Sequence, residues 1–186
     1  VTKMDTSTLT TINFVENDTD TQALTASDLK AGDSVGIIQN NAEEPGTVTL
    51  GLKDASGSAD SLTLTLYGQD AAIALADNGI DDLSIASIET LNIVSDVVLT
   101  LGNEQLKSTE GNTITDISAD TALTTINASG NDKLIMTVGS EATALTTLDM
   151  SGMTYDASAT LATGAVAVTL GSGNDTISGG NGTDII

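Results

Sequence analysis

The chain contains no cysteine, no histidine and no arginine. Without cysteine there are no disulfides, no zinc–thiolate sites and no cysteine nucleophile. Without histidine, a histidine-dependent catalytic triad, a histidine-bound metal and a histidine general base are all excluded, which leaves oxygen ligands and hard cations. These absences predict that the chain is not an enzyme.

Basic and aromatic residues are also scarce. Five lysines stand against 26 acidic residues, for a net charge of −21, and aromatic residues make up 2% of the 186 positions. A nucleic-acid partner is excluded because it requires a basic footprint, and polysaccharide cleavage is disfavoured because aromatic platforms are missing. No apolar run is long enough to predict a membrane span. A chain this acidic repels itself unless cations neutralise it.

The apolar residues, 39% of the chain, are mostly aliphatic and alternate with small polar residues. Leu62, Leu64 and Leu66 alternate with Thr63 and Thr65, a pattern that predicts a half-buried strand. Residues 25–33 suggest a helical turn or tight loop, and 70–82 a short helix or wide turn. Other strands are expected at 35–38, 47–52, 83–85, 88–94, 97–101, 113–117, 123–128, 134–138, 145–150 and 165–170, the first two of them as a possible hairpin.

One short motif recurs at irregular spacing. L-T-T-I-N occurs at Leu9–Asn13 and again at Leu123–Asn127, and related segments occur at Ile88–Asn92 and Leu145–Asp149. Chance recurrence in a chain rich in threonine and leucine is one explanation. The other is a single type of strand, reused in structural repeats of unequal length. Short strands separated by small polar turns make either a sandwich or a solenoid. The scarcity of aromatic residues favours the solenoid, because a thin core filled by aliphatic residues does not need them.

The last seventeen residues, Leu170–Ile186, carry the strongest repeat. The pattern G-x-G-x-D-x-I is met twice, nine positions apart, at Gly171, Gly173, Asp175 and Ile177 and then at Gly180, Gly182, Asp184 and Ile186. Such a nonapeptide combines a glycine-rich turn for Ca²⁺ with a short strand that points one apolar residue inward. Glycine permits the turn, and aspartate supplies the anionic oxygen that Ca²⁺ prefers. A glycine-rich linker does not explain the fixed phase of the isoleucines.

These repeats resemble the RTX calcium-binding family. Combined with the threonine-rich strands, they resemble bacterial surface-layer proteins of that family. The resemblance implies an all-β fold, a right-handed parallel β-helix or β-roll solenoid with RTX calcium-binding turns at its C-terminal end. From the residues themselves we expect an irregular β segment over residues 1–60, either an inserted hairpin or the start of the solenoid, then solenoid repeats over 61–169 and RTX repeats over 170–186. Each RTX ion lies between turns eighteen residues apart, so we expect Asp175 and Asp184 to be half-sites completed by residues beyond Ile186, in a chain that is a fragment.

Two further acidic groups are weaker candidates. Ser129–Asp132 repeats the turn Ser172–Asp175, which makes Asp132 either a calcium ligand or part of an ordinary turn. Asp77, Asp81 and Asp82 surround an Asn-Gly turn and either hold a hard cation or, as we favour, form a solvated acidic turn.

The resemblance implies a structural, non-catalytic protein that is secreted by a type I system and located on the bacterial cell surface. There it would bind Ca²⁺ and assemble laterally with copies of itself, with possible contact to cell-surface polysaccharide through parts outside this sequence. Two alternatives remain open: a segment of a large RTX adhesin, and a non-catalytic carrier region of a secreted RTX enzyme.

Overall fold

A computed structural model describes residues 10–16, 23–39, 46–68, 78–97, 111–119, 121–162 and 164–186. These residues form an all-β structure of two parallel sheets. No helix within them is long and apolar enough to cross a membrane. The first sheet contains β1 (Thr11–Glu16), β3 (Ser34–Gln39), β5 (Ser61–Gly68), β8 (Thr90–Val97), β10 (Thr125–Gly130), β12 (Thr147–Met153) and β14 (Ala167–Thr169). The second contains β2 (Leu24–Leu29), β4 (Thr47–Leu52), β6 (Asn78–Ile80), β7 (Asp82–Ala86), β9 (Asn112–Ala119), β11 (Leu134–Val138), β13 (Ala157–Leu161) and β15 (Thr176–Ser178).

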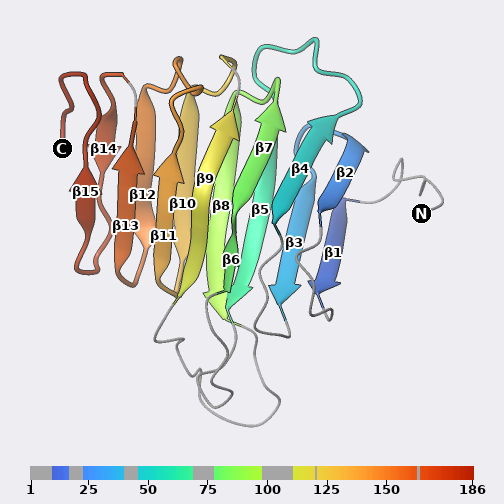
Figure 1. Ribbon diagram of the computed structural model, residues 1–186, viewed down its shortest axis with the longest axis horizontal. Helices are drawn as coiled ribbons and strands as arrows, with labels where there is room; N and C mark the ends of the chain where they lie inside the picture. Colours follow the sequence, from blue (N-terminus) through green and yellow to red (C-terminus); the bar gives the residue numbers. More distant parts are fainter. Residues whose placement is uncertain are drawn as a thin grey trace, which may run out of the picture.

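The chain winds between the two sheets. With β6 set aside, successive strands alternate between the sheets, and each pairs in parallel with the next strand of its own sheet. The strands therefore follow one another along the long axis, from β1 at one end to β15 at the other (Figure 1). This winding is consistent with a β-helix or β-roll. One full winding, here called a rung, lengthens from 23 residues between Thr11 and Ser34 to 35 between Asn92 and Asn127. It then shortens to 22 between Thr124 and Thr146 and to 18 between Ala157 and Asp175.

The core lies between the two sheets and is built from columns of aliphatic residues. Leu62, Leu91, Ile126, Leu148 and Val168 are register partners on successive strands of the first sheet. All but Val168 are fully buried, and Val168 is 7% exposed. Side chains at alternate positions point to opposite faces of a strand, so the Thr-Leu alternation of β5 places its leucines in this core. Burial of aliphatic area of this kind is the main stabilising contribution to such a fold.

The recurrent motif is one strand position repeated in register. Thr90, Thr125 and Thr147 are partners on β8, β10 and β12, as are Asn92, Asn127 and Asp149 two residues later. The Nδ2 group of Asn127 donates a hydrogen bond to Oδ1 of Asn92 at 2.9 Å on the outer face of the sheet. The first copy of the motif is displaced by two residues, because its Thr11 shares a column with Asn92 rather than with Thr90.

Most of the predicted strands are present, and three expectations were wrong at least in part. Residues 24–29 form strand β2 rather than a helical turn, whereas a tight turn follows at Gly32, which has a φ of 89°. Strands β3 and β4 belong to different sheets and are not a hairpin, so residues 11–52 take part in the same two sheets as the rest. Strand β13 was not predicted. The helix or wide turn expected at 70–82 lies outside the described residues up to position 77, and Asn78–Ile80 within it form strand β6 instead. The strand expected at 97–101 lies outside them beyond Val97.

Candidate calcium-binding turns

The first glycine-rich turn joins the two sheets immediately before β15. Its aspartate, Asp175, faces the preceding rung: Oδ1 accepts the backbone N–H of Ala157 at 3.0 Å. The second carboxylate oxygen, Oδ2, accepts the N–H of Gly171 at 3.1 Å, within the same turn. Asp175 therefore closes its own turn and attaches that turn to the chain eighteen residues earlier.

The second turn lies at the opposite corner, where the chain leaves β15 and returns to the first sheet. Oδ1 of Asp184 accepts the N–H of Val166 at 3.1 Å, again across eighteen residues. Ile185 then continues the first sheet as a parallel bridge partner of Ala167. The two nonapeptides thus form one rung, and each carboxylate occupies the equivalent place at its own corner. This equivalence follows from the nine-residue phase of the sequence.

Three of the turn glycines are in close contact with the preceding rung. A Cβ atom on Gly171 would lie 2.4 Å from the carbonyl oxygen of Met153, and one on Gly173 would lie 2.5 Å from that of Tyr155. A Cβ on Gly182 would lie 2.0 Å from the carbonyl oxygen of Gly164. Such approaches are below any real Cβ contact, so a side chain at these positions would push the turn away. Gly180, the remaining predicted position, lies half-buried at the start of the second turn.

The residues present fit one half of a calcium site at each corner. Ca²⁺ binds six to eight oxygen atoms, usually with more than one carboxylate. Each turn contributes one aspartate, and the place above it in the preceding rung is held by Ala157 or Val166, neither of which has a ligand oxygen in its side chain. Within the described ranges, no group of three or more acidic residues is close enough to hold a metal ion. A complete site needs a second carboxylate-bearing turn.

One carboxylate beside the first turn was not predicted from the sequence. Asp156 precedes Ala157, and its Oδ1 accepts the N–H of Asn174 at 2.9 Å. It stands eighteen residues before Asn174, one position away from the place expected for a ligand. The eighteen-residue spacing was the one signal that could have located Asp156. The turn before β13 does not match the nonapeptide pattern, so the pattern did not identify this residue.

Asp132 lies in a buried polar corner rather than in an exposed turn. Its side chain is fully buried, and Oδ1 accepts the N–H of Lys133 at 2.9 Å. Nearby, Asn112 donates from Nδ2 to Oγ of Ser95 at 2.9 Å, and both side chains are buried. The expected equivalence with the RTX turn does not hold in register, because Leu134, not Asp132, shares the column of Ala157. Calcium binding by Asp132 stays a prediction.

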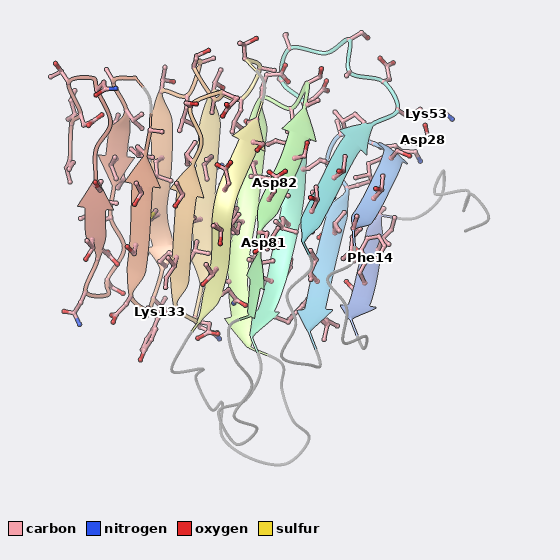
Figure 2. The ribbon with its side chains drawn as sticks, viewed as in Figure 1. Phe14, Asp28, Lys53, Asp81, Asp82 and Lys133 are labelled. Atoms are coloured by element: carbon pink, nitrogen blue, oxygen red, sulfur yellow. The ribbon has the colours of Figure 1, made fainter. Side chains whose placement is uncertain are left out.

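The acidic turn before β7 is only partly described. Asp77 lies outside the described residues, Asp81 is exposed and Asp82 is half-buried at the start of the strand (Figure 2). The N–H of Asp82 donates to the carbonyl oxygen of Gly46 at 2.9 Å, which places it in the ladder with β4. Oδ1 of Asp82 is buried without a hydrogen-bond partner among the described residues. One such oxygen beside an exposed aspartate does not make a metal site.

Ser27 and Lys30 have the S-x-x-K spacing of enzymes in which lysine activates a serine. Residues three apart are neighbours on a helix, whereas here Ser27 lies in strand β2 and Lys30 follows its end. Leu29, which stands between them, points into the core and is fully buried. The helical geometry of that motif is therefore not present. The prediction that the chain is not an enzyme rests on the missing cysteine and histidine rather than on the spacing of Ser27 and Lys30.

Comparison of the chain with family models, with curated proteins and with solved structures gave no match.

Proposed function

We propose that this chain is part of a structural protein of the bacterial cell surface, secreted by a type I system, that folds on calcium and assembles laterally with copies of itself. In this proposal the winding is a right-handed solenoid, and the glycine-rich corners are RTX turns. The observation that carries it is the pair of carboxylates, Asp175 and Asp184. Each lies at one corner of an eighteen-residue rung, bonded to the equivalent corner of the rung before.

In this proposal, the folding of the turns depends on the charge around them. The chain carries a net charge of −21, and adding rungs with one aspartate at every corner would place like charges about 5 Å apart, the spacing of neighbouring strands. Where the cytosolic Ca²⁺ concentration is low, this repulsion keeps such turns open and the segment secretable. Bound Ca²⁺ would supply the positive charge that offsets the repulsion, with dissociation constants of about 10⁻⁴ to 10⁻³ M for extracellular modules.

Residues of this chain already position the turns at which Ca²⁺ would bind. Gly171, Gly173 and Gly182 hold the turns against the backbone of the previous rung. Asp175 fixes the turn by accepting two N–H groups, which leaves its carboxylate at the corner. Lateral assembly would then use the stacked sheets, because parallel ladders and their edges present regular rows of backbone and side-chain groups.

The test combines circular dichroism with sedimentation in the presence and absence of millimolar Ca²⁺, with Mg²⁺ as the ionic control. It uses the chain and a form extended by four nonapeptides, so that Asp175 and Asp184 each gain a partner turn. The proposal predicts Ca²⁺-dependent β-structure and large assemblies for the extended form. It also predicts loss of both with Asp175→Asn and Asp184→Asn together, but not with Asp54→Asn, which changes the charge at an exposed residue.

Calcium-induced folding without assembly would reject the lattice function and favour an adhesin or carrier segment. No response of the extended form to Ca²⁺ would reject the calcium-binding turns themselves.

A further inference from the structure

Two lysines meet at one corner of this acidic molecule. Lys30 follows β2 and Lys53 follows β4, and the preceding residues Leu29 and Leu52 are register partners. The N–H of Lys53 donates to the carbonyl oxygen of Leu29 at 2.8 Å, which extends the ladder to the lysines. Neighbouring strands lie about 4.8 Å apart, so two ammonium side chains leave the sheet beside one another. An anion bound near both lysines would be stabilised by two positive charges.

The two lysines line a hollow rather than a flat surface. Its volume is about 410 Å³, and its walls are Leu29, Lys30, Ala31, Lys53, Asp54, Ser56, Gly57 and Asp60. This is in the range of small-molecule sites, which begin at about 300 Å³. The loop that follows β4 forms the opposite wall, so the hollow brings together two positive groups on one side and polar oxygens on the other.

One of these oxygens lacks a donor. Oδ2 of Asp60 is buried and has no hydrogen-bond partner among the described residues. The backbone N–H of Asp60 donates to Oε2 of Glu89 at 2.7 Å, and its carbonyl oxygen accepts the N–H of Thr90 at 3.0 Å, so the main chain fixes the position of this residue. Leaving a buried carboxylate oxygen unpaired is costly, and a turn of this carboxylate toward the hollow would let a ligand hydroxyl donate to it and remove that cost.

The carboxylate of Asp54 differs from that of Asp60. Its Oδ1 accepts both the N–H and the hydroxyl of Ser56, at 3.1 and 2.7 Å. These bonds, the hydroxyl first, lower the pKa of Asp54. It therefore stays ionised and can accept a further hydroxyl. A ligand for this hollow needs one anionic group for the lysines and several hydroxyl donors for Asp54 and Asp60.

We propose that this hollow, formed by Lys30, Lys53, Asp54 and Asp60, binds a carboxylated sugar, the uronic acid unit of an acidic polysaccharide. The carboxylate of the sugar lies at the lysines, and its ring hydroxyls donate to the two aspartates. An amino acid meets the charge requirement less well, because its single ammonium group cannot serve two separated carboxylates. No aromatic ring lines the hollow, so we expect weak binding, with a dissociation constant on the order of millimolar.

The test is a titration with sodium glucuronate in calcium-free buffer, followed by amide chemical shifts. Glucose and acetate serve as ligand controls, the first lacking the carboxylate and the second the hydroxyls. Lys53→Gln is compared with Lys133→Gln, which removes the same charge. Lys133 precedes β11 and so lies at the opposite ends of the strands of this sheet (Figure 2).

We expect saturable shifts at residues 29–31 and 53–60 with glucuronate, and binding at least about tenfold weaker in Lys53→Gln and in Asp60→Asn. Lys133→Gln and Lys53→Arg should bind normally, and melting temperatures identify any variant that is misfolded. Equal weakening by both glutamine substitutions, or no saturable shift, would overturn the proposal. So would equal binding of glucose or of acetate, the latter marking a simple anion site. None of these outcomes depends on the calcium-binding turns.

Discussion

The central rungs and the terminal rung of this molecule are held together by different interactions. In strands β8, β10 and β12, most inward positions are leucine, isoleucine or methionine, with Ala128 and Ser95 among them, and all have almost no exposed area. At the C-terminal end, Ile177 is half-buried and Ile186 is 70% exposed, and carboxylates and glycines add contacts to the preceding rung. The comparison shows that buried aliphatic area holds the central rungs together, whereas hydrogen bonds to carboxylates and close backbone contacts at glycines attach the terminal rung, which makes that attachment sensitive to charge.

The largest expected effect is in the central core. Ile126→Ala removes a fully buried side chain from the column between Leu91 and Leu148, and we expect a loss of about 2–5 kcal/mol in the free energy of unfolding. Ile186→Ala, in the terminal rung, should change it by no more than about 0.5 kcal/mol, because Ile186 is 70% exposed. Urea denaturation measures both. Similar losses for the two would show that the terminal rung has an apolar core of its own.

Glycine substitutions test the same difference between the central rungs and the terminal rung. Gly130 has a φ of 131°, and a Cβ there would meet the carbonyl oxygen of Ser95, so Gly130→Ala should cost about 1–3 kcal/mol in global stability. Gly182→Ala should open the last turn only, with faster amide exchange at residues 164–168 and an unchanged midpoint of global unfolding. Gly51→Ala is the control, because no atom lies within 4 Å of its added Cβ. A global loss in Gly182→Ala would mean that the two regions unfold together.

Asp175→Asn tests the terminal turn without removing its side chain. In calcium-free buffer we expect faster hydrogen exchange at the amides of Ala157 and Gly171, equivalent to about 1–2 kcal/mol of local stability, because charge-assisted bonds become neutral or are lost. Amides of β8 and β10 should keep their protection. Loss of protection in those central strands would contradict the division into two regions.

The smallest effect is the pH dependence of one exposed turn. The hydroxyl of Ser151 and then its backbone N–H donate to Asp149 and lower the pKa of that carboxyl below its ordinary value. A lowered pKa in the folded state stabilises the fold above the unfolded pKa of about 3.9, and this stabilisation is lost as the pH falls through the folded value. Ser151→Ala should therefore lose less than about 0.5 kcal/mol at pH 7 and progressively less below pH 4. An equal loss at pH 2 and pH 7 would exclude this origin.

The sequence predicted the repeated strand better than its register. Alternation in β5 and the recurrent motif identified the strands of the central rungs because their inward residues are large and aliphatic. Strand β13 was missed because Ala157 and Ala159 have low strand propensity. A helical turn was wrongly expected near Thr25, since the tertiary pairing of β2 with β4 outweighs local preference.

For the candidate site, the spacing of the residues located both turns but could not predict their hydrogen bonds. The nine-residue phase predicted that Asp175 and Asp184 occupy equivalent corners, and it identified Ala157 as the position above Asp175. It could not reveal that the backbone N–H of Ala157 would itself be the partner. Nor could it reveal that Asp132, with the same local sequence, would be buried two positions out of register. The lysine hollow was also beyond prediction, because Lys30 and Lys53 meet only through the parallel pairing.

The central claim is that Asp175 and Asp184 are halves of calcium sites, and calorimetric titration of Ca²⁺ into the chain extended by four nonapeptides tests it most directly. The account predicts saturable binding that the unextended chain lacks, and a stoichiometry that falls by one ion in Asp175→Asn and by one more when Asp184→Asn is added. Equal binding by the extended chain and this double variant would contradict it, as would Mg²⁺ binding equal to that of Ca²⁺.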